Sequence, residues 1–363
     1  MPIRQRGFLF KKDHALFLLG FLALPLLAVV GNELHSAVES EGGQLKNHRQ
    51  QSTRTALHKA IEEGKIDDAS RLIAAGAAVN AQDSFGLTPL HFAVIKGDVA
   101  LVKNLVALRA GVNAHDKRGD TPLHMIAANH GSAELARIML EAGARPDLAN
   151  SDGSTPLHWA AGEGNLPLIK LLLASGADLH ARDKKGDSVL HWAVEDGRNE
   201  AAAHLLAVGA DPNTKNNYDR TPLHWAARRG HLSLAVLLLS KGAVSDARAT
   251  SGDTPLHWAA AEGHVALAEL LSKKLSTVDL QAQFGETPLH WAVLRGRSEL
   301  VAFLVERGAN VNAADEMGNT PRTLARDRGY EAIVKLLDAK DTLHSANHAA
   351  PVQVALATGE AVR

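Results

Sequence analysis

The chain has 363 residues, of which 45% are hydrophobic and only 4% aromatic, so core material is ample and favours helices over a β-sandwich. Its 39 basic and 40 acidic residues give a formal net charge of -1, without the basic excess that binding along a nucleic acid needs. The chain has no cysteine, which excludes disulfides, thiolate metal sites and a cysteine nucleophile.

The N-terminal segment has the layout of an export signal. Four basic residues precede an uncharged apolar run from Ala15 to Val30. The run is slightly long for a signal peptide and slightly short for a span of about 20 residues, and Pro25 would kink a spanning helix. We therefore expect residues 1–31 to be either a signal peptide cleaved before Asn32 or a membrane anchor that tethers the chain through residues 15–30. A third alternative is an apolar tail that packs on the rest of the chain.

Charge around this segment predicts its orientation. Basic residues precede the apolar run, whereas Glu33, Glu39 and Glu41 follow it. By the positive-inside rule, the N-terminus stays in the cytoplasm and the remainder crosses the membrane. We expect an exported protein, periplasmic or membrane-anchored, in which residues 32–50 form a linker.

One hexapeptide recurs along residues 51–340, with a spacing of 33 residues except for one step of 34. The extra residue falls near Asn129, in or just after the first helix of the third copy. The copies begin at Thr55, Thr88, Thr121, Thr155, Ser188, Thr221, Thr254, Thr287 and, in degenerate form, Thr320.

The sixth copy predicts a pair of helices. Thr-Pro is a helix start, so a short helix runs from Pro222 to Arg229 and Gly230 ends it. A second helix extends from His231 to Lys241, with Gly242 after it. Its apolar residues at i, i+3, i+4 and i+7 are supplemented by three further leucines, so it must be covered on more than one side. That periodic set comprises Leu232, Ala235, Val236 and Leu239.

The Thr-Pro-Leu-His-x-Ala motif, the paired short helices and the 33-residue period closely resemble the ankyrin repeat family, and the near-identical copies resemble those of bacterial ankyrin proteins. The resemblance implies an all-α solenoid of about nine helix-turn-helix units with β-turn fingers. It also implies a concave side lined by the first helices and finger tips. Polar residues in the first and ninth copies are typical of capping repeats. Residues 341–363 are expected to form a mobile tail.

Two copies lack the glycine that ends the second helix elsewhere, with Arg109 and Leu275 in its place. A left-handed backbone costs a non-glycine residue about 1 kcal/mol. We therefore expect both loops to take another path, either as a shaped contact or as tolerated drift.

Histidine occupies one position in eight of the nine copies. Helices packed about 8–10 Å apart cannot easily bring successive imidazoles to one ion, which needs nitrogens at about 2 Å. The ankyrin resemblance implies instead that each ring hydrogen-bonds the backbone of the neighbouring finger. These histidines are His58, His91, His124, His158, His191, His224, His257 and His290.

Every tryptophan in the chain follows that histidine, in copies four to eight. The row is either a packing ladder between first helices or a set of anchors for a partner, since tryptophan is enriched in binding hot spots. The row consists of Trp159, Trp192, Trp225, Trp258 and Trp291.

Charge on the first helices changes sign between copies five and six, from Glu195 and Asp196 to Arg228 and Arg229. This switch either orients a partner of complementary charge or is a mixed solvated surface. Aromatic residues at the finger tips are further candidate contacts; they are Phe85, Tyr218 and Phe284.

No glycine-rich phosphate loop, GxSxG or HExxH motif occurs, so we expect no enzymatic activity, no catalytic residue, no metal and no cofactor. The sequence predicts a monomeric, non-enzymatic scaffold that binds a protein of unknown identity, and no nucleic acid, outside the cytoplasm. An inhibitory or stabilising module for one enzyme in the same compartment is the alternative.

Overall fold

The computed structural model describes residues 54–129 and 131–348, with side chains as far as residue 339. The chain divides after Thr55, and the unit that begins at Ala56 contains the repeats. The apolar run at residues 15–30 and the segment 349–363 lie outside the described residues. Within the described ranges, no helix is long and apolar enough to cross a membrane.

Each repeat contributes two antiparallel helices to the unit that begins at Ala56. The first helices are α2 (Ala56–Glu62), α4 (Pro89–Lys96), α6 (Pro122–Ala128), α8 (Pro156–Glu163), α10 (Val189–Glu195), α12 (Pro222–Arg229), α14 (Pro255–Glu262), α16 (Pro288–Leu294) and α18 (Pro321–Asp327). The second helices are α3 (Ile66–Ala74), α5 (Val99–Ala107), α7 (Ala133–Glu141), α9 (Leu166–Ala174), α11 (Asn199–Ala207), α13 (Leu232–Ser240), α15 (Val265–Ser272), α17 (Ser298–Glu306) and α19 (Glu331–His348).

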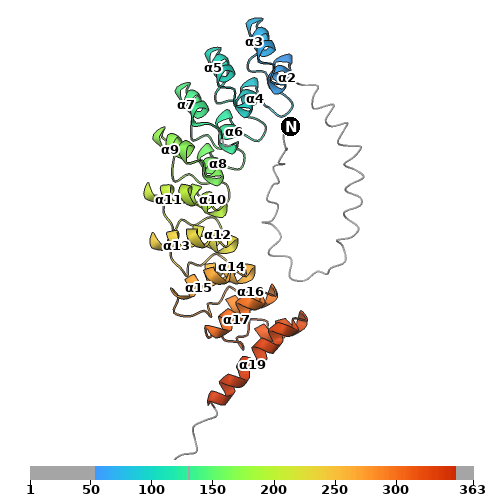
Figure 1. The fold of residues 1–363 in the computed structure, drawn as a ribbon, viewed down its shortest axis with the longest axis vertical. Helices are drawn as coiled ribbons and strands as arrows, with labels where there is room; N and C mark the ends of the chain where they lie inside the picture. The colour runs from blue at the N-terminus through green and yellow to red at the C-terminus, as the bar shows by residue number, and fades with distance from the viewer. Residues whose placement is uncertain (1–53, 130, 349–363) are drawn as a thin grey trace, which may run out of the picture. The chain divides into compact units, whose positions relative to one another are not determined.

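The helix pairs stack into two layers. The even-numbered first helices form one layer and the odd-numbered second helices the other, and the first helices lie on the concave side of this unit (Figure 1). The described residues contain no named strand, only an isolated bridge between Arg182 and Ser188 in one finger. The predicted all-α solenoid of helix-turn-helix units is confirmed.

From α4 onward the first helices begin at a Thr or Ser cap, and α4, α8, α12 and α14 end at a left-handed glycine as the sixth copy predicts. Thr221 adopts an extended backbone with Pro222 at the first helical position, and α12 ends at Gly230 in the left-handed conformation. The histidine three residues after the Thr completes the cap, because its Nδ1 accepts the Thr backbone N–H. The helix start is therefore encoded within four residues of each repeat.

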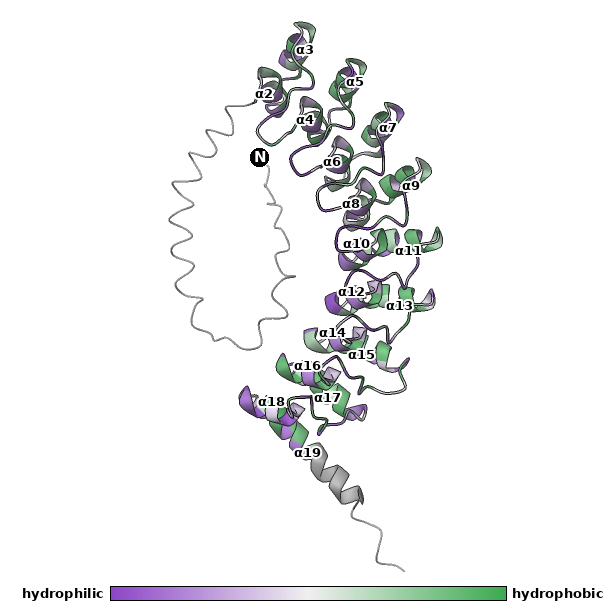
Figure 2. Cartoon of the chain, turned by 180° about the vertical axis from the view of Figure 1, so that it is seen from behind, coloured by the Kyte–Doolittle hydropathy of each residue, from purple (hydrophilic) through white to green (hydrophobic). Residues whose placement is uncertain are grey.

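The sequence predicts that the second helix of the sixth repeat is covered on more than one side, but part of its apolar surface is exposed. In α13 the buried side chains are Leu234, Ala235 and Leu238, whereas Leu232 and Val236 are exposed. Periodicity alone could not separate these two sets, because α13 is apolar on several sides (Figure 2). The first helix of the same repeat and the adjacent second helices decide which side is covered.

Fingers join neighbouring repeats through backbone hydrogen bonds. The amide of Lys117 donates to the carbonyl of Phe85 at 2.8 Å, and each later finger repeats this bond with its predecessor. Most fingers are held in shape by an Asp or Asn that accepts two amides of its own turn, as Asp83 does from Phe85 and Leu87 at 2.8 and 3.0 Å. The fingers therefore align side by side.

The two substituted glycine positions behave differently. Leu275 avoids the left-handed region, and α15 is one residue shorter than most second helices, as expected. Arg109 does not: it keeps the left-handed conformation with φ 60°, so the prediction of another path is wrong there. Asn80 of the preceding finger bonds both Arg109 O and Gly111 N, which holds the loop in the path that glycine takes elsewhere.

The ends of the array carry polar surfaces, as capping repeats should. Lys59, Glu62 and Glu63 are exposed on the first repeat, and residues 326–328 are exposed on the ninth. Helix α19 continues to His348, past residue 340, where the repeat region was expected to end.

Candidate partner-binding surface

The repeated histidines are structural. Each of the eight rings places Nε2 at 3.0–3.4 Å from a carbonyl oxygen just before the next repeat. In seven of them Nδ1 also accepts the backbone N–H of the capping Thr or Ser, so Nε2 carries the proton and donates. The predicted hydrogen bond to the neighbouring finger is confirmed. Among the described residues, no group of three or more His, Asp or Glu could hold a metal ion.

Burial lowers the pKa of the seven repeated histidines from His91 to His290. The value falls to about 4 for His124, His158, His224 and His257, and to about 3 for His191, chiefly because the charged form would lose its hydration. These five rings are therefore neutral at pH 7.

The tryptophan row packs between neighbouring first helices. Trp225 and Trp258 are almost completely buried, at 3% and 4% exposure, whereas Trp159, Trp192 and Trp291 are half-buried. Indole rings of adjacent repeats meet at 6.1 Å between Trp159 and Trp192 and at 5.9 Å between Trp258 and Trp291. The burial favours the packing interpretation for Trp225 and Trp258 and leaves only the other three with substantial surface for a partner.

Most of the indole N–H groups also have partners inside the array. Trp159 Nε1 donates to Ser154 Oγ at 3.1 Å, and Trp258 Nε1 donates to Asp253 at 2.5 Å, each five residues earlier. The corresponding position before Trp225 is Arg220, which cannot accept a hydrogen bond. Most repeats have an acidic or polar residue at this position, whereas the sixth repeat has Arg220. Alignment of the nine copies could have identified Arg220 as unusual.

The candidate charges lie close together around α10 and α12. Arg229 Nη2 pairs with Glu195 Oε1 at 2.7 Å across adjacent repeats, so the predicted sign switch includes an internal ion pair. Asp196 is exposed at the end of α10. Arg228 instead lies over two indole rings, 5.3 Å from Trp225 and 5.2 Å from Trp258.

After α10, α12, α14 and α16, the side chain that follows the next glycine hydrogen-bonds a backbone carbonyl of the previous repeat. Arg198 Nε donates to Gly162 O at 2.7 Å, and Arg297 Nε donates to Ala261 O at 2.9 Å. His231 and His264 reach the corresponding carbonyls of Glu195 and Arg228, each at 3.2 Å. These contacts satisfy carbonyls at helix C-termini that the helix itself leaves without donors.

The three aromatic finger residues are exposed, at 41% for Phe85, 47% for Tyr218 and 48% for Phe284. They occupy the same repeat position, and their backbone carbonyls accept the bond from the next finger, so the backbone at each of them is held in place. Met317 takes that position in the ninth repeat and is 76% exposed, a residue that the sequence analysis did not single out.

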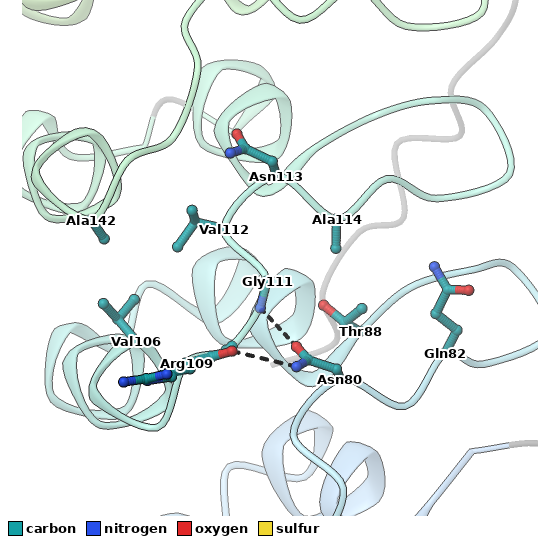
Figure 3. A pocket seen from close by; sticks show the side chains of 11 residues that line it. Asn80, Gln82, Thr88, Val106, Arg109, Gly111, Val112, Asn113, Ala114 and Ala142 are labelled. Atoms are coloured by element: carbon teal, nitrogen blue, oxygen red, sulfur yellow. Dashed lines mark hydrogen bonds between the residues drawn. The ribbon is translucent and has the colours of Figure 1, made fainter.

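An open hollow of ≈ 510 Å³ lies beside the loop that carries Arg109 (Figure 3). Its lining consists of Asn80, Gln82, Thr88, Val106, Arg109, Ala110, Gly111, Val112, Asn113, Ala114 and Ala142. Figure 3 shows the Asn80 amide hydrogen-bonded to the backbone of Arg109 and Gly111. Arg109 is the one ionisable residue of the lining, so the hollow contains no acid–base pair for catalysis.

Buried carboxylates support the fingers. Asn216 Nδ2 donates to Asp187 Oδ1 at 2.8 Å, and Asn150 repeats this contact with Asp120 at 2.7 Å. Burial raises the pKa of Asp187 to about 6, against the lowering effect of Asn216.

The two-layered array of helix pairs and linked fingers defines a helical repeat protein of the solenoid class. A family model described as ankyrin repeats (3 copies) matches residues 28–116, 90–183, 190–283 and 274–347. The chain therefore belongs to the ankyrin repeat family, whose repeats are generally modules for protein–protein interaction. No curated protein matches the chain.

Proposed function

We propose that this protein is a non-enzymatic scaffold that binds a protein partner on its concave side, as a monomer and outside the cytoplasm. One observation carries the proposal. The residues that every repeat shares are engaged in caps and contacts between repeats, whereas the first helices of repeats five and six differ in charge on the concave side. We expect the residues that differ between repeats to determine which partner binds.

Photo-crosslinking in the cells that produce the protein tests this. A benzoyl-phenylalanine probe at Asp196 or Arg229 lies on the concave side, and matched probes at Lys170 or Glu200 lie on exposed positions of second helices. Cross-links to one protein from the first two positions and none from the second two are expected. Cross-links from Lys170 and Glu200 alone would contradict the concave binding site.

The alternative is that the array inhibits or stabilises one enzyme in the same compartment. The cross-linked partner distinguishes the two functions. If it is an enzyme whose rate or half-life changes when this protein is added at the concentration that saturates binding, the alternative holds; if neither quantity changes, the scaffold function holds.

Export is tested separately by cell fractionation and N-terminal sequencing. A soluble protein that starts at Asn32 would mean a cleaved signal, and an intact Met1 in the membrane fraction would mean an anchor through residues 15–30. An intact protein in the cytosol would contradict export. Light scattering of the purified protein measures its molar mass, and a mass above that of one chain would contradict the proposed monomer.

A further inference from the structure

Two arginines of the sixth repeat converge on one indole ring. The guanidinium of Arg220, in the finger, lies 5.0 Å from the centre of the Trp258 ring, and that of Arg228, on α12, lies 5.2 Å from it. Arg220 also lies 5.2 Å from the Tyr218 ring. Contacts of this kind hold both cations in position before any partner arrives.

Neither cation has a carboxylate of its own. Among the described residues, no carboxylate oxygen lies within 4.0 Å of either guanidinium, and Arg220 Nε is buried without a hydrogen-bond partner. The two acids that act on Arg228 are engaged elsewhere: Glu195 pairs with Arg229 at 2.7 Å and Glu262 pairs with Arg297 at 3.6 Å. The Arg220–Arg228 pair therefore carries two positive charges that no carboxylate of the described residues contacts directly.

The repeat register explains why Arg220 lacks a partner. Asn216 Nδ2 contacts Asp187 Oδ1 at 2.8 Å, and 33 residues later the equivalent positions are Ala249 and Arg220. An alanine thus stands where the previous finger supplies a polar side chain. A partly buried cation without a counter-ion is costly, and an anion that reached it would gain charge-assisted hydrogen bonds.

We propose that the Arg220–Arg228 pair is the docking point for a glutamate or aspartate side chain of the protein partner, with the Tyr218 ring contacting the adjacent part of the partner. This inference deepens the proposed function and depends on it. The surroundings favour a single carboxylate in a protein over a nucleic acid. Acids at Glu195, Asp196 and Glu262 lie in the flanking repeats and would repel a continuous line of phosphates, and the net charge is -1.

The test begins with a displayed library of random 12-residue peptides selected on the full-length protein. We expect the selected peptides to share a Glu or Asp at one position. Replacement of that acid by Gln or Asn, and the variants Arg220→Gln and Arg228→Gln, should each weaken binding about 10-fold to 100-fold, as loss of a charge-assisted hydrogen bond does. Lys170→Gln is the matched control, because Lys170 is an exposed cation on the second helix α9, outside the concave side, and should change affinity about twofold or less.

A second variant keeps both arginines. Ala249→Asp places a carboxylate opposite Arg220 by the repeat register, so it should compete with the partner and weaken peptide binding while the unfolding midpoint is unchanged or raised. This variant separates loss of the docking charge from loss of folding.

The outcomes are distinct. Selected peptides without a shared acid, or acidic peptides that bind Arg228→Gln as well as the original protein, overturn the docking point but leave concave binding intact. If no peptide is selected and no concave cross-link forms, both the docking point and the proposed function fail. If a 20-nucleotide oligo(dT) binds and both Arg220→Gln and Arg228→Gln abolish that binding, the ligand of the arginine pair is a phosphate and the proposal of a protein carboxylate is overturned.

Discussion

At the scale of single residues, the left-handed backbone positions show how context overrides local preference. Arg109 and Asp219 have φ of 60° and 56° at positions where other repeats have glycine. Asp219 is held by Thr250 Oγ1 and Lys215, and the Arg109 loop is held by Asn80. Hydrogen bonds from adjacent repeats therefore offset a conformational cost that each residue has on its own.

Arg109→Gly should raise the free energy of unfolding by about 1 kcal/mol, because glycine adopts the left-handed conformation without the steric cost. Chemical denaturation measures the change. Leu275→Gly is the control: that residue is outside the left-handed region and packs against the core, so the same replacement should destabilise. Equal changes in the free energy of unfolding for Arg109→Gly and Leu275→Gly would contradict the left-handed backbone of Arg109.

Gly153, in a finger, should tolerate substitution less well than Gly176, which follows the second helix α9. A Cβ at Gly153 would lie 2.7 Å from Lys184 N in the next finger, whereas a Cβ at Gly176 would meet nothing within 4 Å; both have positive φ. Gly176→Ala should cost about 1 kcal/mol and Gly153→Ala clearly more, because it adds a clash with backbone to the same strain. Thermal unfolding of the two variants compares them, and a smaller loss for Gly153→Ala would refute the close contact between fingers.

At the scale of elements, the starts of α9, α11, α13, α15 and α17 are each hydrogen-bonded to the repeat before. The stem of Arg198 covers Gly164, and its Nε donates to Gly162 O near the end of α8. Glu163 lies 4.0 Å from the same guanidinium and adds little at the surface. One side chain thus fixes how two helices from different repeats approach.

Arg198→Ala should lower the free energy of unfolding by about 1 kcal/mol, because the carbonyl of Gly162 loses its donor and the arginine stem leaves Gly164. Urea denaturation gives the value. Lys170→Ala removes an exposed cation from α9 of the adjacent repeat and should be nearly neutral. If both substitutions cost the same, the contact between repeats contributes nothing beyond surface charge.

At the scale of the whole molecule, stability is distributed over junctions between repeats. Each junction has the same parts: a histidine that reaches the next finger, a backbone bond between fingers and stacked first helices. A repeat without neighbours cannot form these contacts, so disruption in the middle should weaken both flanking junctions.

Acid should destabilise the array well before carboxylates titrate in bulk. In the folded state five histidines have pKa values of about 3 or 4, against 6.5 for a free ring, so the unfolded chain binds more protons below pH 6.5. Their contribution is complete above pH 6.5 and falls progressively as the pH drops toward 4. Asp187, with its pKa raised to about 6, opposes this trend but is outnumbered.

We therefore expect the urea midpoint to fall between pH 7 and pH 5. His257→Asn should lower stability at pH 7 and reduce the slope of stability against pH, because one titrating ring is removed. A midpoint that is equal or higher at pH 5 would contradict the neutral, buried assignment of these rings.

The sequence by itself determined the number and order of the repeats and the starts of the helices from Thr88 onward. It also determined the structural role of the histidines through the family resemblance, because these depend on residues within one period and its copies. Only the tertiary structure decided which side of α13 is buried, which tryptophans keep an exposed surface and how Arg109 keeps a left-handed backbone. It also brought Arg220 to Trp258 and left it without a carboxylate. Those features depend on contacts between residues about one repeat apart. The sequence pattern of a single repeat does not show which side chains of adjacent repeats contact each other.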